Sequence, residues 1–142
     1  MKITSPKTEA EFQQYYHLRW RILRQPWNQP EGSEKDNEED HCYHVIAIEN
    51  NTIAGVARLQ FAEKNCTQLR YMAVDDAFQG QGVGRLIVEH MEQYAKENNA
   101  YELFLNAREN AVRFYEKLGY KITEKSYLLF DSIQHYKMMK KL

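Results

Sequence analysis

Apolar residues recur with a helical period near the start of the chain. They stand three or four positions apart over residues 12–23, which is the spacing of one face of an α-helix. Thr8 and Glu11 precede this pattern in the arrangement of a capping box, and Pro26 stops it. A short strand around Ile3 comes first. The chain is therefore predicted to begin with one strand and one amphipathic helix.

The middle of the chain has the pattern of three consecutive strands. Residues 44–48 and 53–61 are apolar and rich in β-branched side chains, and two asparagines separate them, so this pair is predicted to form a hairpin. A third strand covers residues 69–74. We expect the three strands to be antiparallel neighbours in one sheet.

The second half alternates helical and extended patterns. A long helix is predicted over residues 83–98, where apolar positions repeat every 3.6 residues. Four elements follow as strand, helix, strand and strand, over residues 101–105, 111–118, 120–129 and 133–139. The order predicts an α/β fold of the α+β kind, with a mixed, mostly antiparallel sheet and helices on both faces. We expect one domain, residues 1–142.

Composition narrows the possible partners. The chain is 43% hydrophobic and 27% charged, which is typical of a globular protein, and its formal net charge is -1. Such a charge provides no field to attract nucleic acid or an acidic membrane, so any phosphate must be bound locally. No stretch approaches the ~18 apolar residues of a membrane span. With only Cys42 and Cys66, no disulfide framework is indicated, and we expect a cytoplasmic protein.

A glycine-rich turn, QGQGVG at residues 79–84, lies between the strand predicted over residues 69–74 and the long helix. Glycines let successive backbone N–H groups converge on an anion, and a helix start adds free donors and a positive dipole end. A tight turn without a ligand explains the same glycines, so both interpretations stand. The spacing matches neither a P-loop nor a dinucleotide-binding fingerprint.

The turn resembles the coenzyme A signature of the GNAT superfamily of N-acetyltransferases, Q/R-x-x-G-x-G/A, which Gln79, Gly82 and Gly84 match. The string LNARENAVRFYEKLGYKI is similar to a later strand and helix of that family, with Tyr115 in the expected place, and SIQHYKMMKKL resembles its last strand. The resemblance covers residues 44–142. It implies a fold in which a bulged fourth strand splays from a parallel fifth.

The resemblance also implies where acetyl-coenzyme A, as cosubstrate, would be bound. Backbone groups of Met72, Ala73 and Val74 would line the pantetheine arm, and an N–H near Val74 would polarise the thioester carbonyl. The glycine turn would take the diphosphate on its amides, with Gln79 closing over it. The residues concerned are Gly80, Gln81, Gly82, Val83, Gly84 and Arg85.

One position departs from the family pattern. Many members have an asparagine seven residues before the tyrosine, and here that position is Arg108. Asn106 and Asn110 stand on either side of it and are candidates for the cofactor contact.

The reaction implied is transfer of acetyl from acetyl-coenzyme A to a primary amine of a small molecule or peptide, by direct attack. The leaving thiolate gains from a proton donor, and by position Tyr115 takes that role. Phe114 and Tyr115 are also compatible with a purely structural aromatic core. Two further hypotheses remain: a non-catalytic coenzyme A-binding sensor or scaffold, and a structural interaction domain.

The general base is not assigned by the sequence. A carboxylate or histidine must take a proton from the alkylammonium before the amine can attack, and for each candidate a structural or solvated role is the alternative. The candidates are Glu39, Asp40, His41, His44 and His135. No metal is expected, because the string HCYH at residues 41–44 supplies too few ligands at a recognisable spacing.

The stretch after the first predicted helix contains six carboxylates. In the family that the chain resembles, this region forms the binding site for the acceptor amine. The six carboxylates attract a cationic amine, or the stretch is simply a solvated, mobile loop. The six are Glu31, Glu34, Asp36, Glu38, Glu39 and Asp40. Trp20 and Trp27 either wall a pocket there or anchor the loop to the core. Dimers are common among similar proteins, but nothing in the sequence specifies a homodimer.

Overall fold

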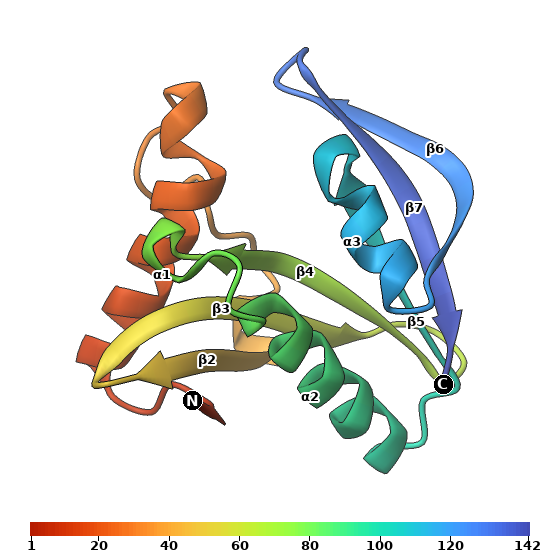
Figure 1. Cartoon of the computed structure of the whole chain (residues 1–142), viewed down its shortest axis with the longest axis horizontal. Coiled ribbons are helices and arrows are strands. Elements are labelled where there is room, and N and C mark those ends of the chain that lie inside the picture. The colour runs from red at the N-terminus through yellow and green to blue at the C-terminus, as the bar shows by residue number, and fades with distance from the viewer.

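A computed structural model describes residues 1–142 as one seven-stranded sheet with helices on both faces (Figure 1). The sheet order is β1-β2-β3-β4-β5-β7-β6, and every neighbouring pair is antiparallel except β4 and β5, which are parallel. The strands are β1 (Lys2–Thr4), β2 (Tyr43–Glu49), β3 (Thr52–Phe61), β4 (Cys66–Val74), β5 (Glu102–Arg108), β6 (Lys121–Leu129) and β7 (Ile133–Lys141). The predicted fold class is thereby confirmed.

Three α-helices join these strands: α1 (Glu9–Leu23), α2 (Val83–Glu97) and α3 (Val112–Lys117). Short 3-10 turns cover Gln25–Trp27, Glu39–His41, Asp76–Phe78 and Glu109–Ala111. The predicted capping box is present at the start of α1, where the Glu11 amide donates to Thr8 Oγ1 at 3.1 Å and the Thr8 amide donates to Glu11 Oε1 at 3.0 Å. None of the helices has the length and apolarity that crossing a bilayer requires.

The order of elements follows the sequence prediction, but β4 begins earlier than expected, at Cys66 instead of residue 69. The apolar pattern used for the prediction does not include residues 66–68, because the side chain of Thr67 is polar. It is nevertheless fully buried, and its hydroxyl donates to the Glu102 carbonyl at 3.0 Å. A satisfied hydroxyl is tolerated in the core, so the apolar pattern alone fails to mark the strand's start.

The core has two layers separated by the sheet. On one face α1 contributes Tyr15 and Leu18, which pack against Ile46, Val56 and Ala73 of the central strands. The opposite face is larger and is covered by α2 and α3 (Figure 1). This arrangement fixes α1 and α3 on opposite sides of β4.

A bulge in β4 and the parting of β4 from β5 shape the centre of the sheet. Arg58 pairs with Arg70 and Val56 pairs with Ala73, so two residues of β4 stand opposite one residue of β3. Tyr71 in this bulge has a φ of 54°. The pairing of β4 with β5 extends only over residues 66–68 and 102–104, after which the strands diverge. The predicted bulged, splayed strand is confirmed.

Candidate active site

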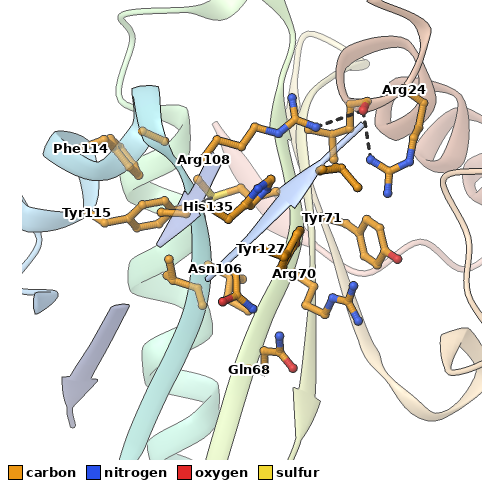
Figure 2. A pocket seen from close by; sticks show the side chains of 17 residues that line it. Arg24, Gln68, Arg70, Tyr71, Asn106, Arg108, Phe114, Tyr115, Tyr127 and His135 are labelled. Atoms are coloured by element: carbon orange, nitrogen blue, oxygen red, sulfur yellow. Dashed lines mark hydrogen bonds between the residues drawn. The ribbon is translucent and has the colours of Figure 1, made fainter. Parts of the chain in front are cut away.

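A cavity of about 180 Å³ lies where β4 and β5 part (Figure 2). Its walls come from five places in the chain: the end of α1, the bulge of β4, the end of β5, α3, and the β6–β7 hairpin. Met72, Asn106, Tyr115 and His135 are among the lining residues. The splay therefore brings together side chains that lie far apart in the sequence.

Tyr115 belongs both to the core and to the cavity wall. Its side chain is 7% exposed, and its hydroxyl lies 3.9 Å from the Met72 sulfur, to which it donates. Burial raises the pKa of Tyr115 well above that of an ordinary phenol. The hydroxyl therefore stays protonated at neutral pH and is available as a proton donor.

His135 is the one predicted base candidate that lines this cavity. Its Nδ1 lies 3.0 Å from the Ile133 carbonyl, an acceptor, so Nδ1 carries the proton and donates. In the neutral ring Nε2 then holds the lone pair. The Tyr127 ring stacks on the imidazole at 4.3 Å, and burial lowers the pKa of His135 below 6.5. A neutral histidine of this kind accepts a proton at ordinary pH.

The other base candidates lie elsewhere. Asp40 and His41 are exposed on the turn before β2. His44 is buried, and both ring nitrogens are engaged, Nδ1 with the Tyr15 hydroxyl and Nε2 with the Glu39 carbonyl, each at 2.7 Å. None of these residues lines the cavity that contains Tyr115. No three His, Cys, Asp or Glu side chains come together as a group that could hold a metal ion.

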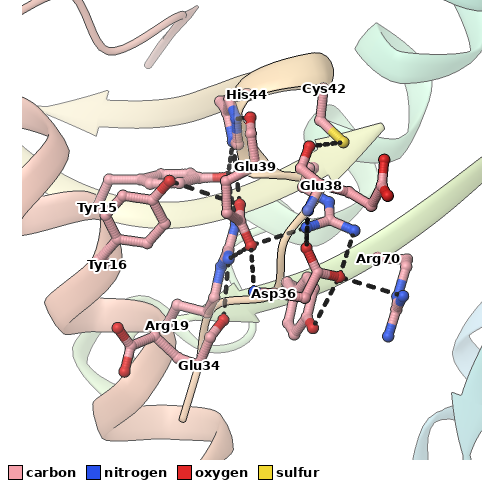
Figure 3. A network of polar contacts seen from close by, with 12 residues as sticks. Tyr15, Tyr16, Arg19, Glu34, Asp36, Glu38, Glu39, Cys42, His44 and Arg70 are labelled. Atoms are coloured by element: carbon pink, nitrogen blue, oxygen red, sulfur yellow. Dashed lines mark hydrogen bonds and ion pairs between the residues drawn. The ribbon is translucent and has the colours of Figure 1, made fainter. Parts of the chain in front are cut away.

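The carboxylates of the acidic stretch are partly used inside the protein (Figure 3). Glu39 accepts from Arg19 at 2.9 Å and from Arg58 at 2.7 Å, and Arg58 also donates to Asp36 at 2.7 Å. Hydrogen bonds from Arg58 hold the pKa of Asp36 far below its ordinary range. Asp36 and Glu39 therefore do not belong to a solvated loop, and their charges are already paired with arginines and do not attract a further cation. Both interpretations from the sequence are wrong for these two residues. Glu34, 4% exposed, is also buried.

The glycine turn presents a row of unengaged donors. None of the six backbone N–H groups of residues 80–85 donates to another group of the protein. Gly80 and Gly82 have φ values of 76° and 78°, and a β-carbon on either would touch nothing within 4 Å. Their need for glycine is therefore conformational. The positive end of the α2 dipole adds to the attraction of this turn for an anion.

Close packing links this turn to Tyr115. A β-carbon on Gly84 would lie 3.0 Å from the Phe114 ring and 3.6 Å from the Met72 methyl carbon. Met72 thus lies between the start of α2 and the Tyr115 hydroxyl. A second cavity, about 440 Å³, runs between α2 and α3 and is lined by Arg85 among others. Arg85, directly after the turn, therefore borders this groove, while Gly84 packs near Met72 of the bulged strand β4.

The remaining predicted cofactor contacts occupy different surroundings. Gln79 Nε2 donates to the Val74 carbonyl at 3.1 Å, which ties the turn to the end of β4. Asn106 lines the cavity, and its Oδ1 accepts from the Ser126 hydroxyl at 2.9 Å. Asn110 is exposed and does not line the cavity. The contacts proposed for these residues stay predictions.

Arg108, which replaces the family asparagine, lines the cavity from the end of β5. Its guanidinium lies 4.5 Å from the centre of the Trp27 ring. Trp27 does not line the cavity itself. Trp20 anchors the following segment, because its Nε1 donates to the Gln29 carbonyl at 2.9 Å. Trp20 also lines a separate cavity of about 560 Å³ with Glu31 and Glu34, so both interpretations hold for Trp20, whereas Trp27 packs against the Arg108 guanidinium.

Arg24, Arg70 and Tyr71 also line the cavity, and the sequence analysis did not single them out. Tyr71 is placed there by the bulge, which no sequence pattern marks. Arg24 follows the last apolar position of the first helical pattern, where a cation is ordinary for a helix end. The sequence thus carries no signal that distinguishes these side chains from surface residues.

The comparisons with known proteins agree with this geometry. The model of the acetyltransferase (GNAT) family matches residues 12–120, and the chain belongs to that family. YjcF of Bacillus subtilis (strain 168), an uncharacterized N-acetyltransferase, is 27% identical over 140 residues, which cover 99% of each chain. The [ribosomal protein bS18]-alanine N-acetyltransferase of Haemophilus influenzae is 32% identical over 122 residues, 84% of this chain and 82% of its own.

Solved structures show the same fold. An aminoglycoside 6'-N-acetyltransferase complexed with coenzyme A superposes with a TM-score of 0.84 at 17% identity, covering 99% of this chain and 97% of that one. The ribosomal-protein-S18-alanine N-acetyltransferase of Escherichia coli gives a TM-score of 0.79 at 24% identity, covering 99% and 92%. At these identities the likeness concerns the fold.

Proposed function

We propose that this protein is an N-acetyltransferase that moves the acetyl group of acetyl-coenzyme A to a primary amine of a small molecule or peptide. One observation carries the proposal: the six N–H groups of residues 80–85 make no hydrogen bond within the protein, and Gly84 of this row packs near Met72, which in turn contacts the hydroxyl of the buried Tyr115. The Met72 side chain thus lies between Gly84, in the turn proposed to bind the diphosphate, and Tyr115, the proposed proton donor.

The cosubstrate would be held mainly by main-chain groups. The amides of residues 80–85 and the α2 dipole suit a diphosphate, whose charge needs several donors. Beyond residue 68, β4 has no partner on its β5 side, so the gap suits an extended arm beside Met72, Ala73 and Val74. Family membership supports acetyl-coenzyme A as the donor.

In the reaction, the neutral amine nitrogen attacks the thioester carbonyl carbon, so that a C–N bond forms and the carbonyl oxygen becomes an oxyanion. A backbone N–H near Val74 stabilises this oxyanion. The C–S bond then breaks, and the leaving thiolate takes the proton of the Tyr115 hydroxyl. The proton lost by the attacking nitrogen passes to Nε2 of His135, directly or through water. The products are an amide and the coenzyme A thiol, and the enzyme is restored when His135 releases its proton to water and the Tyr115 oxygen takes one up.

The names of the relatives indicate different acceptors and do not identify the acceptor of this protein. By their names, one acts on the alanine of a ribosomal protein and another on an aminoglycoside. A primary amine is common to both. We therefore take the amine as the reacting group and expect its surroundings in this chain to decide the acceptor.

Replacing Tyr115 with Phe tests the acid role. Loss of a general acid is expected to lower kcat roughly 10²–10⁴-fold. Stability should change little, because the hydroxyl contacts only the Met72 sulfur, a weak acceptor. Coenzyme A release from acetyl-coenzyme A is measured with an amine panel. Tyr101→Phe removes the same hydroxyl from an exposed tyrosine and is the matched control.

The same assay separates the alternative of a sensor or scaffold. A protein that binds coenzyme A but shows no amine-dependent release with any acceptor would be a binding module. Unchanged kcat in Tyr115→Phe, with wild-type turnover present, would remove the acid assignment but leave the acetyltransferase in place.

A further inference from the structure

The cavity at the splayed strands has a strongly asymmetric charge. Arg24, Arg70 and Arg108 line it, and no aspartate or glutamate does. Arg70 is partly neutralised by Asp36, whose Oδ2 lies 3.5 Å from its Nη1. The other two arginines make no ion pair. The sign of this charge is opposite to the one expected from the acidic stretch.

Arg24 and Arg108 come together on one backbone atom. Arg24 Nη1 and Arg108 Nη2 each donate to the carbonyl oxygen of Leu23, both at 3.0 Å, and the dashed lines of Figure 2 meet there. Arg24 Nε also donates to the Ser33 carbonyl at 3.1 Å. Two cationic groups from distant parts of the chain are thus held side by side with only neutral acceptors.

This pairing is unfavourable without an anion. Burial, together with the nearby charge of Arg24, lowers the pKa of Arg108 to about 10. Burial likewise lowers the pKa of Arg24. The chain's two fully buried arginines show the contrast, because Arg19 and Arg58 both contact the Glu39 carboxylate. Buried charges are normally paired in this way.

We infer that Arg24 and Arg108 bind an anionic group of the acceptor, so that the preferred acceptor is a small amine that also carries a carboxylate or a phosphate. The inference rests on the proposed function, and it specifies the substrate class. Guanidinium groups present planar, paired N–H donors that match both kinds of oxyanion.

The size and position of the cavity fit this acceptor. At about 180 Å³ it is smaller than the roughly 300–1,000 Å³ of sites for drug-sized ligands, so it suits a compact molecule. The two arginines enter from the end of α1 and the end of β5, whereas Tyr115 enters from α3 (Figure 2). An acceptor anchored by its anion at the arginines would direct its amine toward Tyr115 and His135.

The same charges argue against polycationic acceptors. Polyamines and aminoglycosides would bring ammonium groups against guanidinium groups in a partly buried site, where like-charge repulsion is weakly screened. Asp36 and Glu39 do not relieve this repulsion, because they already pair with arginines.

The test compares amines that differ only in the anion. Acetyl transfer by the wild-type protein is measured with L-methionine and L-methionine amide, β-alanine and β-alaninamide, and phosphoethanolamine and ethanolamine, with spermidine and kanamycin alongside. We expect kcat/KM to be at least about tenfold higher for the anionic member of a pair, as one charged hydrogen bond provides. Comparing the carboxylate pairs with the phosphate pair tells which anion is preferred.

Variants locate the effect. Arg108→Gln is expected to erase the preference for the anionic member, so that the ratio of kcat/KM between the two members of a pair falls to about one. Arg108→Lys retains the positive charge but lacks the planar, paired N–H donors, so it should keep part of the preference. Arg113→Gln is the control, since Arg113 is exposed on α3 and makes no hydrogen bond or ion pair. Binding of the best anionic amine in the presence of coenzyme A, followed by calorimetry, gives a readout without turnover, including for a variant with impaired stability.

The outcomes separate the two proposals. No acetyl transfer to any amine by the wild-type protein, together with no binding of an anionic amine, would overturn the proposed function and this inference with it. Transfer to neutral amines, spermidine or kanamycin at rates equal to or above those of the anionic partners would overturn the inference alone. A preference for anions that survives in Arg108→Gln as in Arg113→Gln would also overturn it.

Discussion

At the scale of single residues, burial holds the two side chains that we propose for proton transfer in their uncharged forms. Burial raises the pKa of Tyr115, so its hydroxyl retains the proton, and lowers the pKa of His135, so its ring stays neutral. A donor that keeps its proton and an acceptor that lacks one are what an acyl transfer to an amine requires at neutral pH.

The His135 assignment predicts a particular pH profile. In the wild-type protein kcat/KM should fall on the acidic side as His135 takes up a proton, with a midpoint below 6.5. His135→Gln should lose this limb and lower kcat about 10²-fold or more. The profile is measured with one amine for both enzymes, so ionisation of the acceptor affects them equally. His17→Gln, on the exposed side of α1, should retain the wild-type profile. An acidic limb that persists in His135→Gln would assign the base elsewhere.

Single residues also show where sequence reasoning succeeded and where it failed. The helical period identified Tyr15 and Leu18 as buried, and the same period places Arg19 on that face, four residues after Tyr15. Arg19 is fully buried, so the pattern contained a signal of the ion network. Its partner Glu39 is twenty residues away, beyond an irregular segment, and periodicity says nothing about such a contact.

At the scale of elements, the start of α2 combines a structural and a proposed binding role. Gly82 is the N-cap residue with no side-chain cap, and its positive φ aims the amides that follow it. The glycine string was readable in the sequence because it stood between a strand and a helix. Free N–H groups at the helix start were expected from this position, but that Gly80 and Gln81 also make no hydrogen bond depends on how the turn at Asp76–Phe78 and the end of β4 fold beside them.

Gly82→Ala separates these two roles. An alanine at a left-handed position costs roughly 1–2 kcal/mol of stability. Gly32, with a φ of 100° and no atom within 4 Å of a β-carbon, is a matched control outside the proposed site. We expect both substitutions to lower the free energy of unfolding in urea by similar amounts. Only Gly82→Ala should raise KM for acetyl-coenzyme A, about tenfold. Equal KM values in the two variants would contradict the role of the turn in diphosphate binding.

At the scale of the whole molecule, three histidines are held with lowered pKa values. Burial is the main cause for His44, His90 and His135 alike. In the unfolded chain each would titrate near 6.5. Below that pH the unfolded state binds protons that the folded state resists, so the stability present above 6.5 is lost as pH falls through the folded pKa values.

This linkage predicts acid sensitivity before the carboxylates titrate. The free energy of unfolding should fall between pH 7 and pH 5, with a limiting slope of about 1.4 kcal/mol per pH unit for each histidine involved. The urea midpoint should fall with it. His44→Gln, at a position within the core, should reduce the slope. The paired carboxylate of Asp36, whose pKa is lowered, contributes only at a lower pH. A midpoint that is constant from pH 7 to pH 5 would contradict the prediction.

The bulge in β4 has a consequence for the length of the chain. Tyr71 and Met72 together face one residue of β3, so the strand contains one residue more than its ladder uses. A chain shorter by that residue would keep Arg70 opposite Arg58 and Ala73 opposite Val56 in an uninterrupted ladder, and would lose only the additional side chain that the bulge supplies. One codon in β4 therefore provides one of the two neighbouring side chains, Tyr71 and Met72, that line the cavity.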